Sequence, residues 1–221
     1  MEDDAMTQDA RSTAAQTPAA GTDAAAPRFP VLDPERLSPA QSATLQAILA
    51  GPRAGTNDPA TVRRVLTGGP FNAWLRSPEL GDRLQRVGAY IRYESSLPLR
   101  LNELAILVTA RVWTSQFEWY AHRPLAEKAG LEPRIADELA LGRRPEQMRD
   151  DEAAVYDFCT QLHRTRNVDD ATFARALALF GERGVVDLVG VCGYYTAVSM
   201  TLNVARVPLP AGEPLPLAPL D

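Results

Sequence analysis

Lysine, cysteine and histidine are scarce in this chain of 221 residues. Lys128 is the single lysine among 23 basic residues, and it stands six residues beyond His122 in one predicted helix. At about 100° per residue, it projects away from the face that carries the histidine. A mechanism that needs a lysine Schiff base is therefore not expected.

The two cysteines, Cys159 and Cys192, are far apart in sequence and match neither a metal-binding nor a redox-active spacing. We interpret them as small apolar residues that are buried in the core. Two such thiols are compatible with a reducing, cytoplasmic setting.

Long apolar runs and strong positive charge are also missing. No stretch reaches the roughly 20 apolar residues that cross a membrane, and the N-terminus has no basic region followed by an apolar core, as a secretory signal would. The net charge is −5, of which residues 1–28 contribute −3 through five acids and two arginines. We therefore expect a cytoplasmic protein without a membrane or nucleic-acid partner.

The sequence has no period-two alternation of apolar residues, no Gly-x-Gly-x-x-Gly and no Walker motif. Apolar residues instead recur at helical spacing, which predicts an all-α fold. Residues 1–28 lack large apolar side chains and are predicted to be disordered. Residues 29–210 form one predicted helical domain, and residues 211–221 form a proline-rich tail that is either free or laid along a surface.

Helix starts and stops are marked by capping residues, prolines and glycines. Ser38-Pro39 and Asp58-Pro59 each combine a cap with a first-turn proline, and Asp150 is the expected cap of a later helix. The helices predicted from these signals cover about 39–50, 59–66, 79–94, 98–112, 115–129, 133–141, 150–165, 171–180 and 184–206.

The centre of the predicted fold is a helix hairpin over residues 97–131. Its first helix begins at Pro98 and is apolar on nearly every side from Leu101 to Val112, so we expect it to be buried. Glu103 is the one acid inside that run, and a buried acid needs a partner or a raised pKa.

The second helix of the hairpin carries Glu118 and His122, four residues apart and so on one face. This pair and Glu103 form the one constellation in the chain that suggests catalysis. Two structural interpretations compete with it. Ser115-x-x-Glu118 is a possible capping box, and Glu103 is a possible partner of Arg111.

Three motifs in the hairpin carry a resemblance to a known family: Arg100-x-x-Glu103-Leu-Ala-Ile-Leu, Glu118-x-x-x-His122 and Ala129-Gly130-Leu131. This pattern resembles the carboxymuconolactone decarboxylase / AhpD-like family, whose all-helical fold is built on such a hairpin. Its peroxidase branch has a Cys-x-x-Cys pair where this chain has Ser115 and Glu118. The chain therefore resembles the decarboxylase branch.

The resemblance implies a carboxy-lyase-like enzyme of aromatic-compound catabolism, without a cofactor or metal. It would act by acid/base chemistry, decarboxylating or isomerising a small unsaturated carboxylic acid or lactone. Glu103, Glu118 and His122 would then be catalytic, with His122 as the proton donor near neutral pH. The predicted substrate contacts are Phe71, Trp74, Ser115, Trp119, Tyr194 and Tyr195, of which Phe71 and Trp74 have a core position as the alternative.

Two other functions stay open. One is a relative of the peroxidases that has lost its cysteine pair, and the other is a helical binding or assembly module without catalysis. A polar-tipped cavity between the hairpin and the last helix favours an enzyme, whereas a filled core favours the module. We also expect a homo-oligomer, because residues 101–112 and 185–204 are apolar nearly all round and one small domain cannot easily cover both.

Overall fold

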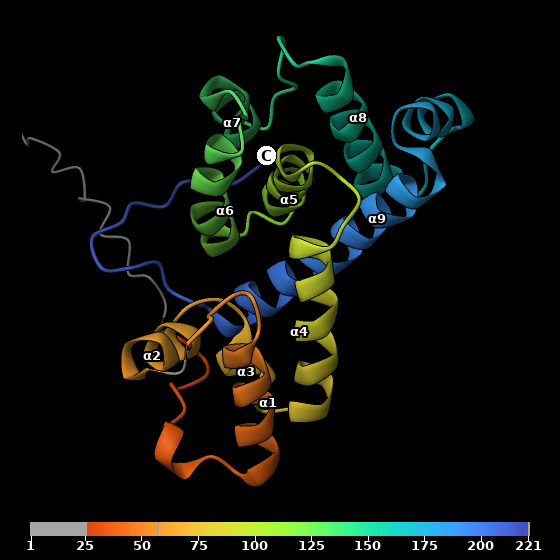
Figure 1. Ribbon diagram of the computed structural model, residues 1–221. Helices are drawn as coiled ribbons and strands as arrows, with labels where there is room; N and C mark the ends of the chain where they lie inside the picture. The colour runs from red at the N-terminus through yellow and green to blue at the C-terminus, as the bar shows by residue number, and fades with distance from the viewer. Residues whose placement is uncertain (1–25, 57, 221) are drawn as a thin grey trace, which may run out of the picture.

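The computed structural model describes residues 26–56 and 58–220, and the regular secondary structure in this part of the chain consists of helices alone, without strands (Figure 1). The all-α prediction is therefore confirmed. The bounds match the sequence signals closely, with three differences. Pro34–Arg36 and Phe71–Trp74 are short helices that we did not predict, and the helices predicted at 171–180 and 184–206 form one bent element. The helices are η1 (Pro34–Arg36), α1 (Pro39–Ala50), α2 (Pro59–Thr67), α3 (Phe71–Trp74), α4 (Pro78–Tyr93), α5 (Leu99–Val112), α6 (Gln116–Lys128), α7 (Pro133–Ala140), α8 (Asp150–Thr165) and α9 (Asp170–Ala205).

Two helices begin at the predicted caps. The Ser38 side chain accepts from the backbone of Gln41 in a complete capping box, and the Asp58 carboxylate accepts from two backbone N–H groups of α2. The cap predicted for α8 is wrong by one residue. Arg149 is the N-cap, and its backbone N–H donates to the Glu152 carboxylate at 2.7 Å.

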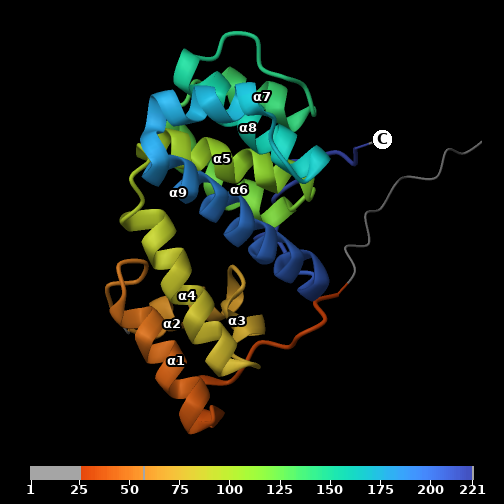
Figure 2. The same cartoon turned by 90° about the vertical axis from the view of Figure 1, so that its right-hand side faces the viewer.

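Helix α5 is the central helix, as predicted. Every side chain from Leu101 to Arg111 is buried, because α6, α7, α8 and α9 all pack against it (Figures 1 and 2). Burial of this kind contributes about 1.5–3 kcal/mol for each large aliphatic side chain. The hairpin that carries the candidate site is thus held by the best-packed part of the protein.

Helix α9 bends at Gly181, whose φ of 68° and ψ of 177° leave the helical region. A glycine adopts this conformation without a steric penalty, and the break predicted near Gly181–Gly184 is confirmed. Among the described helices, α9 alone is long and apolar enough to cross a membrane, with a mean hydropathy of 1.4 in its most apolar window, of which 56% is buried. Core helices share these properties, and packing against α5 and α8 accounts for the buried part.

The apolar side chains form two clusters. The larger one surrounds α5 and extends over α6–α9. The smaller one joins α1, α2 and the end of α3, and α4 connects the two by contacting both α1 and α9 (Figure 2). The members of the smaller cluster are Leu45, Ile48, Leu49, Val65, Leu66 and Leu75.

Both ends of the described chain are attached to the helices. The Arg28 backbone N–H donates to the Ala205 carbonyl at 2.9 Å, so the chain contacts α9 at the predicted boundary of residue 28. The prediction of disorder for residues 1–25 lies outside the described residues. The tail follows the second of its two predicted alternatives. Leu217 is buried in the main cluster, and its N–H and C=O bond to the Gln116 side chain at 3.0 and 2.7 Å.

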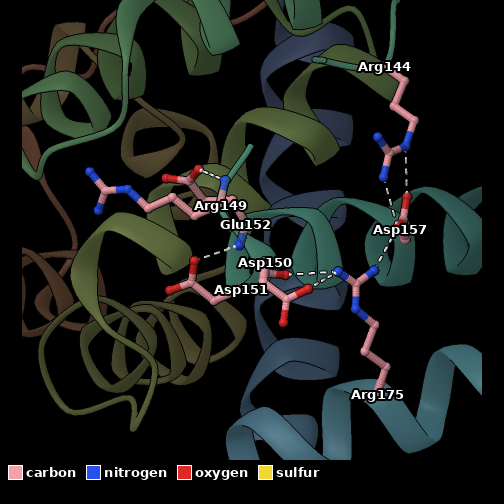
Figure 3. A network of polar contacts seen from close by, with 7 residues as sticks. All are labelled: Arg144, Arg149, Asp150, Asp151, Glu152, Asp157 and Arg175. Carbon is pink, nitrogen blue, oxygen red and sulfur yellow. Dashed lines mark hydrogen bonds and ion pairs between the residues drawn. The ribbon is translucent and has the colours of Figure 1, made fainter. Parts of the chain in front are cut away.

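Charged side chains connect the start of α8 to the first segment of α9 (Figure 3). Arg175 of α9 contacts Asp150 at 2.5 Å and Asp157 at 3.2 Å, and Arg144 contacts the same Asp157 carboxylate at 3.1 Å. Exposed pairs of this kind each contribute no more than about 1 kcal/mol. These ion pairs therefore hold the first part of α9, before Gly181, against α8, and they add little to the stability of the whole fold.

Candidate active site

The hairpin of α5 and α6 brings Glu103, His122 and Glu118 together, as the sequence predicts. His122 Nδ1 lies 2.6 Å from Glu103 Oε2, and His122 Nε2 lies 3.0 Å from Glu118 Oε1. The turn between the helices reverses the chain in a few residues, with Thr114 at a φ of 44° and the Ser115 N–H bonded to the Ala110 carbonyl at 2.9 Å. The imidazole therefore lies between two carboxylates.

All three side chains are withdrawn from solvent. Glu103 is 1% exposed, Glu118 is 4% exposed and His122 is 5% exposed. Burying charge without a partner is costly, so the two carboxylates and the imidazole depend on one another. Both ring nitrogens of the buried histidine are bonded to a carboxylate. A side chain that only filled space in the core would not require this geometry.

The pKa of His122 is raised to about 9. Burial opposes this rise, but the negative charges of Glu118 and Glu103, together with their hydrogen bonds, outweigh it. His122 is therefore an imidazolium at neutral pH, with an N–H directed at each carboxylate.

Two alternatives from the sequence are wrong. Ser115 makes no side-chain cap at the start of α6, and its buried hydroxyl has no hydrogen-bond partner among the described residues. The Glu118 carboxylate is bonded to His122. Arg111 does not pair with Glu103 either. Its guanidinium bonds to Thr114 Oγ1 and the Ala218 carbonyl. The described residues also contain no group of three or more His, Cys, Asp or Glu side chains placed to hold a metal ion.

A cavity of about 300 Å³ opens beside the triad, where the smaller apolar cluster meets the larger one. Glu118 and His122 line it, whereas Glu103 lies behind the histidine. Its walls come from the loop after α1, from α2 and the turn that follows it, and from α3, α4, α6 and α9. The remaining lining residues are Arg53, Arg64, Val65, Gly68, Gly69, Pro70, Phe71, Arg92, Phe117, Ala121, Tyr194, Tyr195 and Val198.

Half of the predicted substrate contacts line this cavity, namely Phe71, Tyr194 and Tyr195. Trp74 does not. It packs edge-on behind Phe71 and Tyr194, with ring centroids 5.8 and 6.2 Å away. The other two predicted contacts are Ser115, the N-cap of α6, and Trp119, inside α6. Ser115 and Trp119 are both fully buried away from the cavity.

The two tyrosines close the cavity on the α9 side. The Tyr195 ring stands edge-on to the His122 ring at 5.1 Å and 83°. Burial is the main reason that the pKa of Tyr194 rises to about 12 and that the pKa of Tyr195 also rises. Both phenols therefore keep their protons at neutral pH and can donate a hydrogen bond.

Sequence reasoning missed three arginines of the cavity: Arg53 in the loop after α1, Arg64 on α2 and Arg92 on α4. Within residues 26–56 and 58–220, none of them forms an ion pair with a carboxylate. Arg53 Nη1 donates to the Gln85 carbonyl at 3.0 Å, while its Nη2 is buried and has no partner in the part of the chain that the structure describes. No local motif marks these arginines, because they come from three separate elements.

Gly88 of α4 lets Tyr194 and Arg53 approach closely. A Cβ atom at this position would lie 2.0 Å from Tyr194 Oη and 2.4 Å from Arg53 Nη2. Such contacts are impossible without movement of both side chains, so the absence of a side chain here shapes the cavity wall. The glycine is also a residue that sequence reasoning did not single out.

Compared with known proteins, the chain matches no family model, no curated protein and no solved structure. The described part of the chain is all-helical. The resemblance of the hairpin motifs to the carboxymuconolactone decarboxylase / AhpD-like family therefore stays a hypothesis.

Proposed function

We propose that this protein is a cofactor-independent acid/base lyase or isomerase, of the carboxymuconolactone decarboxylase type, that acts on a small unsaturated carboxylic acid or lactone. One observation carries the proposal: a buried Glu103–His122–Glu118 triad opens into a cavity with three arginines that have no carboxylate partner among the described residues. The triad supplies a proton, and the arginines supply a site for an anion.

The arginines favour a carboxylate substrate. Guanidinium groups bind carboxylates through paired, charge-assisted hydrogen bonds, and Arg53 Nη2 is a buried donor that nothing in the described chain satisfies. A cavity of about 300 Å³ suits a small molecule. Apolar walls from Phe71, Phe117 and Val198 would exclude water from the rest of the ligand.

The proton path runs through Glu118. Both ring nitrogens of His122 are bonded to carboxylates, and of these two carboxylates only that of Glu118 lines the cavity. We therefore assign proton transfer to the substrate carbon to His122 acting through Glu118. Glu103 holds the opposite nitrogen and stabilises the imidazolium, as the third member of a catalytic triad does.

In a decarboxylation, the bond between the substrate carbon and its carboxylate breaks, and the electron pair moves into a conjugated carbonyl to give an enolate. Tyr194 or Tyr195 donates a hydrogen bond to the enolate oxygen, because both phenols keep their protons. Glu118 takes the proton from Nε2 of His122 and passes it to the carbon, and the neutral His122 then regains a proton from solvent. Isomerisation uses the same groups, with the proton first removed and then returned elsewhere.

A panel of small unsaturated acids and lactones tests this function. Thermal shift identifies ligands, and ultraviolet absorbance with carbon dioxide release then measures turnover. We expect an unsaturated carboxylate to raise the melting temperature and to be consumed, and Glu118→Gln to bind it without turnover. Binding by the parent without turnover of any bound acid would favour the non-catalytic module, and no binding at all would reject the anion site.

A further inference from the structure

An arginine and a tyrosine meet at one corner of the cavity, beside Gly88 of α4. A Cβ atom built on Gly88 would lie 2.4 Å from Arg53 Nη2 and 2.0 Å from Tyr194 Oη. Two atoms so close to one point are neighbours, although Arg53 follows α1 and Tyr194 belongs to α9. Both residues line the cavity, so the corner that they form is part of the space a ligand would occupy.

The Arg53 guanidinium is held on two sides. Its Nη1 donates to the Gln85 carbonyl at 3.0 Å, and its central carbon lies 5.5 Å from the centre of the Phe71 ring, within the range of a cation–π contact. A side chain that is fixed in this way loses little conformational freedom when a ligand binds. Nη2 is buried and finds no acceptor in the described chain, so Arg53 presents one preorganised donor at the corner.

Tyr194 presents the second donor. Its ring is packed edge-on against Trp74 and Tyr195, with centroids 6.2 and 5.2 Å away. Burial is the main cause that raises the pKa of Tyr194 to about 12, so the hydroxyl keeps its proton at neutral pH, and it hydrogen-bonds to no other described residue. A buried donor without an acceptor costs free energy. One negatively charged oxygen placed between the two donors would satisfy both.

We propose that Arg53 Nη2 and Tyr194 Oη form an oxyanion site, which binds a single conjugated oxygen anion of the ligand. That this oxygen is the enolate oxygen rests on the function proposed above, whereas the two donors themselves require only a negatively charged oxygen. The site assigns the enolate to Tyr194 and not to Tyr195. It also divides the work of the arginines, because Arg53 binds the enolate oxygen and Arg92 is left for the substrate carboxylate.

The oxyanion site lies close to the proton donor. The Tyr195 ring is 5.2 Å from the Tyr194 ring and 5.1 Å from the His122 ring, and Glu118 lines the same cavity as Tyr194. When carbon dioxide leaves, the electron pair moves onto the carbonyl oxygen, where Arg53 and Tyr194 stabilise the charge. When Glu118 protonates the carbon, the pair returns to form the new C–H bond and the charge on the oxygen disappears.

4-Nitrophenol tests the site without any substrate, because its coloured phenolate carries the charge on one conjugated oxygen. We expect the full-length protein to bind the phenolate and to lower the pKa of the bound phenol by about one unit or more, measured by absorbance against pH at saturating protein. Arg53→Ala and Tyr194→Phe should each remove most of this shift, with Arg53→Gln as a second variant if Arg53→Ala does not fold. Arg63→Ala and Tyr156→Phe are the matched controls, since neither residue lines the cavity, and both should keep the shift of the parent.

The outcomes separate this site from the proposed reaction. No shift in the parent, or an equal shift in the parent, Arg53→Ala and Tyr194→Phe, would overturn the oxyanion site, even if both variants melted at a lower temperature. A larger loss in Tyr195→Phe than in Tyr194→Phe would also overturn it. A protein that binds the phenolate as expected but turns over no unsaturated acid keeps the oxyanion site and loses the lyase function. With an acid that is turned over, Tyr194→Phe should lower kcat by about 10²-fold, with a smaller change in KM.

Discussion

His122 Nε2 lies 3.0 Å from Oε1 of Glu118, one helical turn earlier on α6, while Nδ1 of the same ring is bonded to Glu103 on α5. One imidazolium therefore donates a hydrogen bond to each of two buried carboxylates. This relationship has consequences for both catalysis and stability, and the two can be separated by substitution.

Replacing His122 should remove activity and also weaken the fold. His122→Ala leaves Glu103 and Glu118 buried without a cation, so we expect turnover to fall by roughly 10²-fold or more and the free energy of unfolding to fall by about 3–5 kcal/mol. Glu103→Gln, in contrast, leaves the His122 imidazolium paired with the Glu118 carboxylate, so the remaining pair carries no net charge. It should lose activity yet melt close to the parent temperature. Chemical denaturation with a turnover assay checks both, and full activity of either variant would contradict the proton path.

Stability should depend on pH through His122. Its folded pKa of about 9 lies above the ordinary value of 6.5, so the folded state binds the proton more tightly than the unfolded state does. The resulting stabilisation is fully present below pH 6.5 and is lost as the pH rises through 9. We expect the melting temperature to fall between these limits, and His122→Gln to flatten that part of the profile. If the melting temperatures of the parent and His122→Gln change with pH in the same way, the pKa of His122 is not raised in the folded protein.

Arg92 should bind the carboxylate of the substrate. Arg92→Ala removes a charged hydrogen bond of about 1.5–3 kcal/mol, so KM should rise roughly tenfold to a hundredfold with a smaller change in kcat. Arg63→Ala is the matched control, since Arg63 is exposed on α2 and does not line the cavity. Steady-state kinetics on an acid found by thermal shift would decide, and equal KM values for Arg92→Ala and the parent would count against the anion site.

Gly88 should resist substitution. An alanine Cβ would lie 2.0 Å from Tyr194 Oη, so Gly88→Ala should displace the tyrosine, lower the stability by about 1–3 kcal/mol and abolish ligand binding. Gly193→Ala is the control on α9, where an added Cβ meets nothing within 4 Å. That variant should gain up to about 1 kcal/mol from helix propensity. Thermal melts of the two variants in parallel give the comparison, and a stable, ligand-binding Gly88→Ala would refute the close contact.

The C-terminal tail should stabilise the domain through Leu217. This side chain is 2% exposed and packs in the main cluster, so Leu217→Ala should cost about 2–5 kcal/mol. Leu215→Ala is the matched control two residues away, because Leu215 is 60% exposed and should change stability by no more than about 0.5 kcal/mol. Similar urea midpoints for both variants would show that the tail is dispensable.

Local signals were enough to predict most of the helices and the placement of Glu118 and His122 on one helix face. Caps and first-turn prolines mark where α1 and α2 begin. The cap side chains accept from helix N–H groups within a few residues, and a first-turn proline has no N–H to leave unpaired. Glu118 and His122 share a face because helical periodicity alone places residues four apart together. Glu103 could be added because an acid inside an apolar helix must find a partner.

The tertiary structure alone decided which distant groups meet. Arg53, Arg64 and Arg92 converge on the cavity from three elements, and Cys159 meets Cys192 across two packed helices. It also decided that the Glu118 carboxylate bonds to His122 and that Ser115 makes no cap. The physical reason is the sequence separation over which each interaction acts. Backbone hydrogen bonds and helical spacing act over about four residues, whereas the cavity and the thiol pair depend on how whole helices pack.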